Sequence, residues 1–278
     1  MRALLAFVAV ASACTGVSPE VKKAADGHRE VALAFVHEAE KAATDNQTLA
    51  DEKYREALKE LLDAEKTGAM DSDGRYLLGF VYFVGFKRYT EAESNIDAAI
   101  KLRQIERQEE YPEAENLMGN VLLDAGHTNE ALAHFERART NLLYATPYFA
   151  EQGMGQALFK LGRHDEAVQH FERALVAQPD LCGAYLKLAE VEIVKGDDAK
   201  VQSVLGDFLT RCDSERLRSS TGPRLLAPAL LELGKSFLRT NAKDRALDSF
   251  RQCVQRFPGE PAARECDQQL RVLDAGAQ

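Results

Sequence analysis

The chain has 278 residues, of which 45% are hydrophobic and 28% are charged, and its formal net charge is -9. An apolar fraction close to the globular average of about 45–50% indicates a folded protein and excludes a disordered chain. The acidic balance argues against nucleic acid as a ligand, because binding to phosphates requires a basic surface. The five cysteines are an odd number, so in an oxidising compartment one of them needs a role other than a disulfide.

The N-terminus has the pattern of a secretory signal peptide. Arg2 precedes an unbroken apolar run over residues 4–11, and the small residues Ser12 and Ala13 come directly before Cys14. A positive charge, a short apolar run and small residues before a cleavage site are typical of such signals. The run is too short to cross a bilayer, which takes about 20 apolar residues.

Small residues that end on a cysteine resemble the bacterial lipobox, in which the cysteine is acylated and begins the mature chain. Ala11 departs from the leucine most common at that position. The resemblance implies a signal peptide over 1–13, lipid (palmitate) on Cys14 and a tether over 14–27, and Thr15 implies sorting to the outer membrane. Two alternatives stay open: an ordinary signal peptide with an incidental cysteine, and a cytosolic protein with an accidental apolar start.

The rest of the chain repeats one spacing of small, large and turn-forming residues. Gly155 is followed by a glycine at +7, alanines at +12 and +19, Phe171 at +16 and Pro179 at +24. Small residues let two antiparallel helices approach closely, the glycine at +7 ends the first helix, and the proline ends the second. The large residue at +16 is then expected to fill the space between the helices. The other anchors, in closer or more divergent form, are Gly79, Gly119, Ala189 and Gly234.

This spacing resembles the tetratricopeptide repeat, a helix–turn–helix unit of about 34 residues. The resemblance implies an all-α, right-handed superhelix of about six helical hairpins, which we expect as a single domain over 28–278 with its first helix within 28–43. The segment Pro261 to Leu273 is expected to be a C-terminal capping helix. Eleven extra residues near Asp213–Pro223 predict a surface loop.

Four cysteines remain if the first carries lipid, and they allow three pairings. Cys182 begins the first helix of one unit and Cys212 ends its second helix, so the two are adjacent in an antiparallel hairpin. Cys253 and Cys266 lie about one turn from the facing ends of the next pair of helices. We predict the disulfides Cys182–Cys212 and Cys253–Cys266, with four buried thiols in a reducing compartment as the alternative.

No arrangement of residues indicates an enzyme. Partial matches to a phosphate-binding loop at Gly234 and to a zinc-protease helix at His37 each lack a required residue. His164 and His170 are six residues apart on one expected helix, so they would not share a face, and we expect both to be solvated. The expectation is a non-catalytic protein without metal, cofactor, small-molecule substrate or nucleic acid.

The first helices of tetratricopeptide folds line a concave face, at offsets of about -3, +1 and +4 from each anchor. These positions and one neighbour predict a partner-binding groove lined by Tyr76, Phe80, Phe83, Asn116, Asn120, Leu123, Phe149, Gln152, Gln156, Phe159, Leu186 and Ile193. The lining is aromatic and amide-rich, and its lack of Lys and Arg departs from the carboxylate clamp of chaperone-binding relatives. It favours an amphipathic or extended peptide held by apolar side chains, although packing between repeats is an equally open role for each aromatic residue.

A lipid-anchored, disulfide-bearing chain of such repeats resembles the pilotin family of type IV pilus assembly (the Tgl, PilF and PilW type). The residues nearest to that resemblance are Asn116-Leu117-Met118-Gly119, Ala131 to Ala138 and Thr140 to Tyr148. It implies an outer-membrane lipoprotein, facing the periplasm, that binds secretin subunits and promotes their outer-membrane localisation and multimerisation. A scaffold lipoprotein that gathers peptidoglycan or outer-membrane assembly factors in the cell envelope is the alternative.

Overall fold

The computed structural model describes residues 17–43 and 46–275. Over these ranges the chain forms thirteen α-helices and no strand. Their bounds are α1 Pro19–Ala42, α2 Gln47–Lys66, α3 Ser72–Phe86, α4 Tyr89–Arg107, α5 Pro112–Ala125, α6 Thr128–Thr140, α7 Pro147–Lys160, α8 His164–Ala177, α9 Cys182–Lys195, α10 Asp198–Cys212, α11 Glu215–Arg239, α12 Lys243–Arg256 and α13 Pro261–Ala275. The expected all-α fold of six helical hairpins with a C-terminal capping helix is confirmed.

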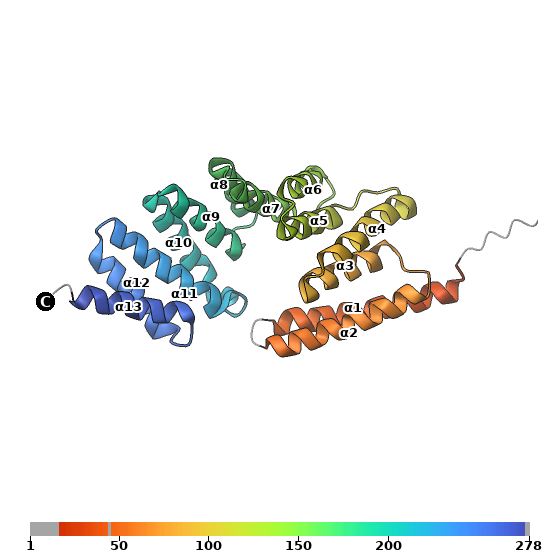
Figure 1. Ribbon diagram of the computed structural model, residues 1–278, viewed down its shortest axis with the longest axis horizontal. Helices are drawn as coiled ribbons and strands as arrows, with labels where there is room; N and C mark the ends of the chain where they lie inside the picture. The colour runs from red at the N-terminus through yellow and green to blue at the C-terminus, as the bar shows by residue number, and fades with distance from the viewer. Residues whose placement is uncertain (1–16, 44–45, 276–278) are drawn as a thin grey trace, which may run out of the picture.

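The hairpins stack in chain order into an arc. Figure 1 shows the first helices α3, α5 and α7 on the inside of this arc and their partners α4, α6 and α8 on the outside. Each helix packs against the next one in the chain, and successive first helices also touch one another. Contacts limited to neighbouring units are the property that makes a solenoid quasi-one-dimensional. The arc therefore presents an extended inner surface built from the first helices.

The anchor glycines make room for the large residue sixteen positions later. A Cβ atom added to Gly119 would lie 2.5 Å from the ring of Phe135, and one added to Gly234 would lie 2.4 Å from the ring of Phe250. Both rings are fully buried. The expected role of the +16 residue, which fills the space between the two helices of a hairpin, is confirmed.

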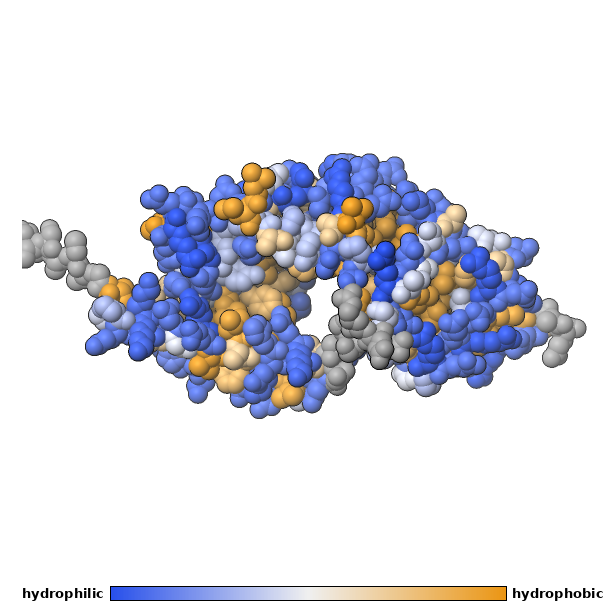
Figure 2. Space-filling view, turned by 180° about the vertical axis from the view of Figure 1, so that it is seen from behind, coloured by the Kyte–Doolittle hydropathy of each residue, from blue (hydrophilic) through white to orange (hydrophobic). Residues whose placement is uncertain are grey.

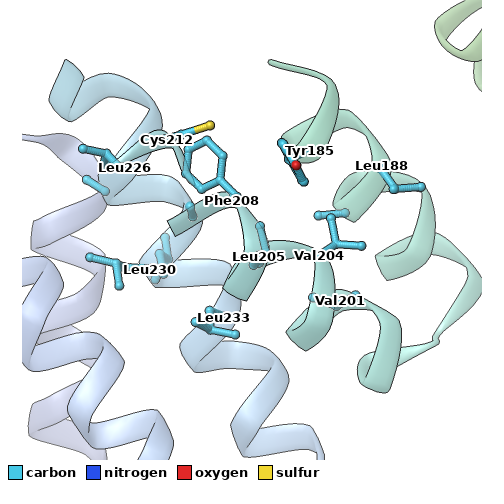
Figure 3. Close-up of a cluster of buried hydrophobic side chains, with 14 of the residues drawn as sticks. Tyr185, Leu188, Val201, Val204, Leu205, Phe208, Cys212, Leu226, Leu230 and Leu233 are labelled. Atoms are coloured by element: carbon cyan, nitrogen blue, oxygen red, sulfur yellow. The ribbon is translucent and has the colours of Figure 1, made fainter. Parts of the chain in front are cut away.

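One continuous core joins the C-terminal hairpins. Figure 3 shows Phe208 of α10 between Tyr185 of α9 and the α11 side, where Leu226 and Leu230 lie. The rings of Tyr185 and Phe208 have centroids 6.4 Å apart, and Phe208 is completely buried. Neighbouring hairpins therefore share side chains, so a unit that cannot bury its own apolar face is completed by the next one.

The structure brings both predicted cysteine pairs to disulfide distance. Cys182 at the start of α9 and Cys212 at the end of α10 have Cα atoms 5.8 Å apart, and those of Cys253 in α12 and Cys266 in α13 are 6.4 Å apart. Both separations lie within the range that a disulfide spans. The first pair closes one hairpin, and the second attaches the capping helix α13 to the body of the solenoid.

Two expectations about helix bounds are wrong. The first helix begins at Pro19 rather than near residue 28, because the Ser18 side chain caps it by accepting a hydrogen bond from the Val21 N–H. The predicted surface loop near Asp213–Pro223 is instead mostly the start of α11, with non-helical backbone at Gly222 (φ 62°, ψ 169°). Glycine tolerates that positive φ and the following proline suits the first turn of a helix, so the segment breaks the helix rather than forming a loop.

The N-terminal predictions lie mainly outside the described part of the chain. The signal peptide over 1–13 and the lipid site Cys14 precede residue 17, and the later part of the expected tether belongs to α1. None of the described helices combines the length and the hydrophobicity needed to cross a membrane.

Candidate functional site

The predicted groove residues all lie on the first helices α3, α5, α7 and α9. Two of them belong to the core rather than to the groove lining, because Phe83 is 9% exposed and Leu123 is 2% exposed. Each is the residue at offset +4, and in these two hairpins that position packs into the core. The Phe83 ring, for example, lies 6.2 Å from that of Tyr89 in α4. The other ten keep accessible surface.

Aromatic side chains gather at the α3 end of the concave face. The rings of Tyr76 and Tyr111 lie 5.4 Å apart between centroids, and Phe80 packs half-buried against the same core. Burial raises the pKa of Tyr76 to about 12, so its hydroxyl stays protonated at any physiological pH. This end of the face is therefore aromatic, and the charged groups that contact it, Arg103 over the Tyr111 ring and Asp73 at the Tyr111 hydroxyl, are paired with each other.

Amide side chains follow in the middle of the arc. Asn116 and Asn120 of α5 and Gln152 and Gln156 of α7 are all half-buried. The Asn116 Oδ1 atom is buried and accepts no hydrogen bond from the described residues. A buried acceptor without a partner is costly. The half-buried amides of this row can each donate and accept hydrogen bonds.

The two phenylalanines of α7 differ in environment. Phe149 is 43% exposed, with its ring centroid 4.7 Å from that of Tyr148. Phe159 is half-buried, 5.5 Å from the ring of His164. Phe149 thus presents its ring on the first turn of α7, whereas Phe159 is held against the neighbouring helix.

An aliphatic pocket of about 360 Å³ lies between α9 and α11. Leu186 and Ile193 line it, as two of the predicted groove residues. The remaining lining residues are Ala189, Glu190, Leu205, Pro228, Ala229 and Glu232. Sequence reasoning missed the α11 contribution, because Pro228, Ala229 and Glu232 lie outside the offsets of -3, +1 and +4 that were used to predict the groove.

The two carboxylates at this pocket form ion pairs within their own helices. Glu190 binds Lys187 at 2.9 Å, and Glu232 binds Lys235 at 2.9 Å. Lys235 also contacts Glu265 of α13 at 2.7 Å. Burial lowers the pKa of Lys235, but hydrogen bonds to the two glutamates outweigh it and raise the pKa above its usual value. The base of the pocket is therefore apolar, and the carboxylates at its edge are already paired with lysines.

Figure 2 shows apolar surface gathered in the hollow of the arc, whereas the outer surface is mostly hydrophilic. Recessed apolar surface on a solenoid is typical of a site that binds a protein segment. The concave face therefore combines an aromatic end, an amide middle and an aliphatic pocket.

His170 is not solvated, contrary to the sequence expectation. Its Nδ1 atom lies 2.6 Å from Glu151 Oε2, and its side chain is only 13% exposed. The preceding hairpin has the same pair, with His134 Nδ1 2.7 Å from Glu115 Oε2. In both hairpins the glutamate precedes the anchor glycine by four residues and the histidine follows it by fifteen. Comparing the two units would have revealed the pair, because it repeats after 36 residues.

Each of these pairs links the two helices of one hairpin. Burial raises the pKa of Glu115, but the hydrogen bond from His134 and the charge of Arg137 outweigh it and lower the pKa below its usual value. The carboxylate therefore stays ionised and ties the two helices of its hairpin together. Within residues 17–43 and 46–275, no cluster of three or more metal-ligating side chains is present.

Comparison with known proteins identifies the repeats. Models of the tetratricopeptide repeat match residues 116–181 and 153–200, and a further model of the same repeat matches 228–259. No curated protein sequence matches the chain.

Several solved structures have the same fold. The crystal structure of PilW, described as a widely conserved type IV pilus biogenesis factor, has 19% identity and a TM-score of 0.70, with 87% of this chain and 97% of that chain covered. PilF of Pseudomonas aeruginosa has 14% identity and a TM-score of 0.66, with 90% and 99% covered. The Cut9–Hcn1 complex of the APC/C has 12% identity and a TM-score of 0.60, with 91% of this chain but 47% of that one covered.

Proposed function

With the chain established as a solenoid of tetratricopeptide repeats, we propose that it is a non-catalytic, lipid-anchored pilotin of type IV pilus assembly. In this proposal, lipid on Cys14 holds the protein at the inner face of the outer membrane. The concave face binds a segment of a secretin subunit and so promotes the localisation and multimerisation of the secretin in that membrane.

The observation that carries the binding role is the apolar lining of the concave face. A client that inserts aliphatic side chains between α9 and α11 removes Leu186 and Ile193 from water, and each Å² of apolar surface buried contributes about 25 cal/mol. The amide row pairs with the client backbone, which gives orientation as well as affinity. Such a surface suits an amphipathic segment rather than a charged chain end.

The pilus assignment is supported by the extent of the likeness. Both PilW and PilF align over almost their whole length with most of this chain, whereas the Cut9–Hcn1 chain extends far beyond the aligned part. The lipobox-like residues before Cys14 support export from the cytoplasm. The two cysteine pairs support an oxidising compartment.

The decisive experiment changes two partly buried residues of the pocket and checks the fold separately. Leu186→Lys with Ile193→Lys places two charges in the aliphatic pocket of the lipidated protein in its own bacterium. We expect secretin multimers, measured by immunoblot of outer-membrane fractions, to be lost, while circular dichroism of the purified variant shows an unchanged helical fold. Phe83 is not a suitable target, because its replacement would disturb the core.

A matched control carries the same charges elsewhere. Val176→Lys with Val194→Lys alters two side chains that are 84% and 56% exposed and do not line the pocket, and this variant should assemble normal multimers. Normal multimers in the pocket variant would contradict the proposal. If crosslinking through the pocket instead captured a cell-wall enzyme, the envelope-scaffold alternative would replace it.

A further inference from the structure

Two of the three places where the chain exceeds the repeat period lie against each other. The first, near residues 103–110, lengthens the end of α4 and its connection to α5, and the second lies between α6 and α7. Asn141 Nδ2 donates a hydrogen bond of 2.6 Å to Glu110 Oε2 and so joins the two insertions. The two inserted segments therefore form one connected structure rather than two independent loops.

Beside this junction lies a groove of about 740 Å³, here called the α4–α6 groove. Its apolar lining includes Ile100 and Ile105 of α4 and Pro112 at the start of α5, and Thr140 of α6 lies opposite. The volume falls within the range of about 300–1,000 Å³ that is typical of ligand-binding clefts. Because α4 and α6 are second helices, this groove lies mainly outside the concave face, and Tyr111 is the lining residue that also contacts Tyr76 at the aromatic end of that face.

Three large aliphatic side chains project into solvent at this place. Ile105 is 76% exposed, Leu142 is 99% exposed and Leu143 is 81% exposed. Single exposed aliphatic residues are normal on a protein surface, but three of them beside an apolar groove indicate an interaction site.

The charges around the groove leave a negative excess. Arg137 is bound to Glu115 at 2.9 Å, and Lys101 is bound to Asp97 at 2.5 Å, so both cations of the groove are neutralised. Glu110 accepts a hydrogen bond only from a neutral amide, and Glu109 has no partner among the described residues. Two exposed carboxylates thus stand next to the aliphatic side chains without a compensating cation.

We propose that the α4–α6 groove is a second docking site, which binds a protein segment that carries aliphatic side chains next to lysine or arginine. The aliphatic side chains enter the groove beside Ile105 and Leu143, and the cationic groups form charge-assisted hydrogen bonds with Glu109 and Glu110. A membrane surface fits the same place less well, because the negative potential of anionic lipids repels the two carboxylates. The site lets the protein hold a second partner while the concave face is occupied.

The absence of tryptophan from the sequence permits a clean binding assay. Leu143→Trp introduces a single fluorescent reporter at an exposed position where the change does not disturb the core. The probe is a short synthetic peptide of leucine and lysine in an amphipathic helical pattern, and its counterpart of leucine and glutamate is the negative control. We expect the lysine peptide, and not the glutamate peptide, to shift the emission to shorter wavelength. A Val176→Trp reporter on α8 should not respond.

Charge variants in the Leu143→Trp background separate a specific site from general attraction to an acidic protein. Glu109→Gln with Glu110→Gln should weaken binding of the lysine peptide at least about tenfold, a factor that corresponds to about 1.4 kcal/mol. Glu52→Gln with Asp274→Asn removes the same charge elsewhere and should leave binding unchanged, as should the Leu186→Lys, Ile193→Lys pocket variant. Equal weakening by both charge pairs would overturn the proposal.

Two other occupants give different results. A tryptophan shift produced by lipid vesicles but not by the lysine peptide would assign the groove to a membrane. A shift that grows with protein concentration without any peptide, accompanied by a larger mass in sedimentation, would assign it to a second copy of the chain. Either result would overturn the peptide assignment while leaving the proposed role of the concave face untouched.

Discussion

Replacement of Gly119 by alanine tests whether the hairpins depend on the close approach of glycine and phenylalanine. The new Cβ would lie 2.5, 2.6 and 2.9 Å from three atoms of the Phe135 ring, so the ring or the helix has to move. A Cβ at Gly153 of α7 would lie 2.4 Å from the same edge of the ring, so this edge contacts glycines of two first helices.

The magnitude follows from two opposing effects. Alanine in a helix interior is more favourable than glycine by about 1 kcal/mol, whereas overpacking of a tight core costs about 1–3 kcal/mol. Gly206 of α10 provides the control, because nothing lies within 4 Å of the position its Cβ would take. We expect Gly206→Ala to be stabilising and Gly119→Ala to be less stable than it by about 1–3 kcal/mol.

The assay is unfolding by urea and by heat, followed by circular dichroism at constant protein concentration. Because solenoids need not unfold in one step, the transition midpoints are compared rather than extrapolated free energies. A chain of this size should shift by about 2–4 °C per kcal/mol. Adding Phe135→Leu to Gly119→Ala should cost less than Phe135→Leu costs alone, since the smaller side chain relieves the overlap. Equal stabilisation by both alanine variants would refute the argument that the rings fill the interhelical space.

Three further predictions follow from the cross-links and the buried ion pair. Intact mass of the exported protein, alkylated without reductant, should show no alkylated thiol at Cys182, Cys212, Cys253 or Cys266, and four modified thiols would contradict both disulfides. Loops of 30 and 13 residues imply that loss of the first bond costs about 3.6 kcal/mol and loss of the second about 2.9 kcal/mol, so the first serine pair should have the lower thermal midpoint. Because the folded pKa of Glu115 is lowered, its contribution is complete above the unfolded value of about 4.3 and is lost as the pH falls through the folded pKa. The thermal midpoint of Glu115→Gln should therefore lie below that of the wild type at pH 7, for a loss of about 1 kcal/mol, and should approach it below about pH 4, whereas a gap that does not vary with pH would contradict this interpretation.

The features that sequence reasoning predicted correctly are those set by one hairpin alone. The glycine at the anchor and Phe135 sixteen residues later determine a contact inside a unit, and the Cys182–Cys212 pair lies at the ends of a single hairpin. A spacing rule captures such contacts, because the two helices of a unit have one relative geometry. The pairing of Cys253 with Cys266 was predictable for a related reason, since α13 directly follows α12.

The features that sequence reasoning missed depend on contacts between helices or on a motif that is compatible with two different structures. Phe83 packs into the core against Tyr89 at the start of α4, a contact between helices that the offsets along the first helix do not specify. The Gly222-Pro223 step is typical of a turn, but the same residues also suit a break between two helical segments. The solvated position expected for His170 is wrong because its partner, Glu151, lies nineteen residues earlier on another helix.

The repeat contains positions that pack the helices together and positions that do not, and this difference explains why the two candidate surfaces differ. Positions that let adjacent helices approach, such as Gly119 and Phe135, are tied to packing and leave no freedom for a partner. The concave face uses the remaining positions of the first helices, so its chemistry changes gradually from the aromatic α3 to the aliphatic pocket beside α9. The α4–α6 groove instead lies where residues are inserted into the repeat. Inserted residues do not have to pack between the two helices of a unit, so they are free to form a binding surface. A solenoid can therefore gain a second partner site without altering the first, and this independence is the property that the paired charge variants and the pocket variant measure.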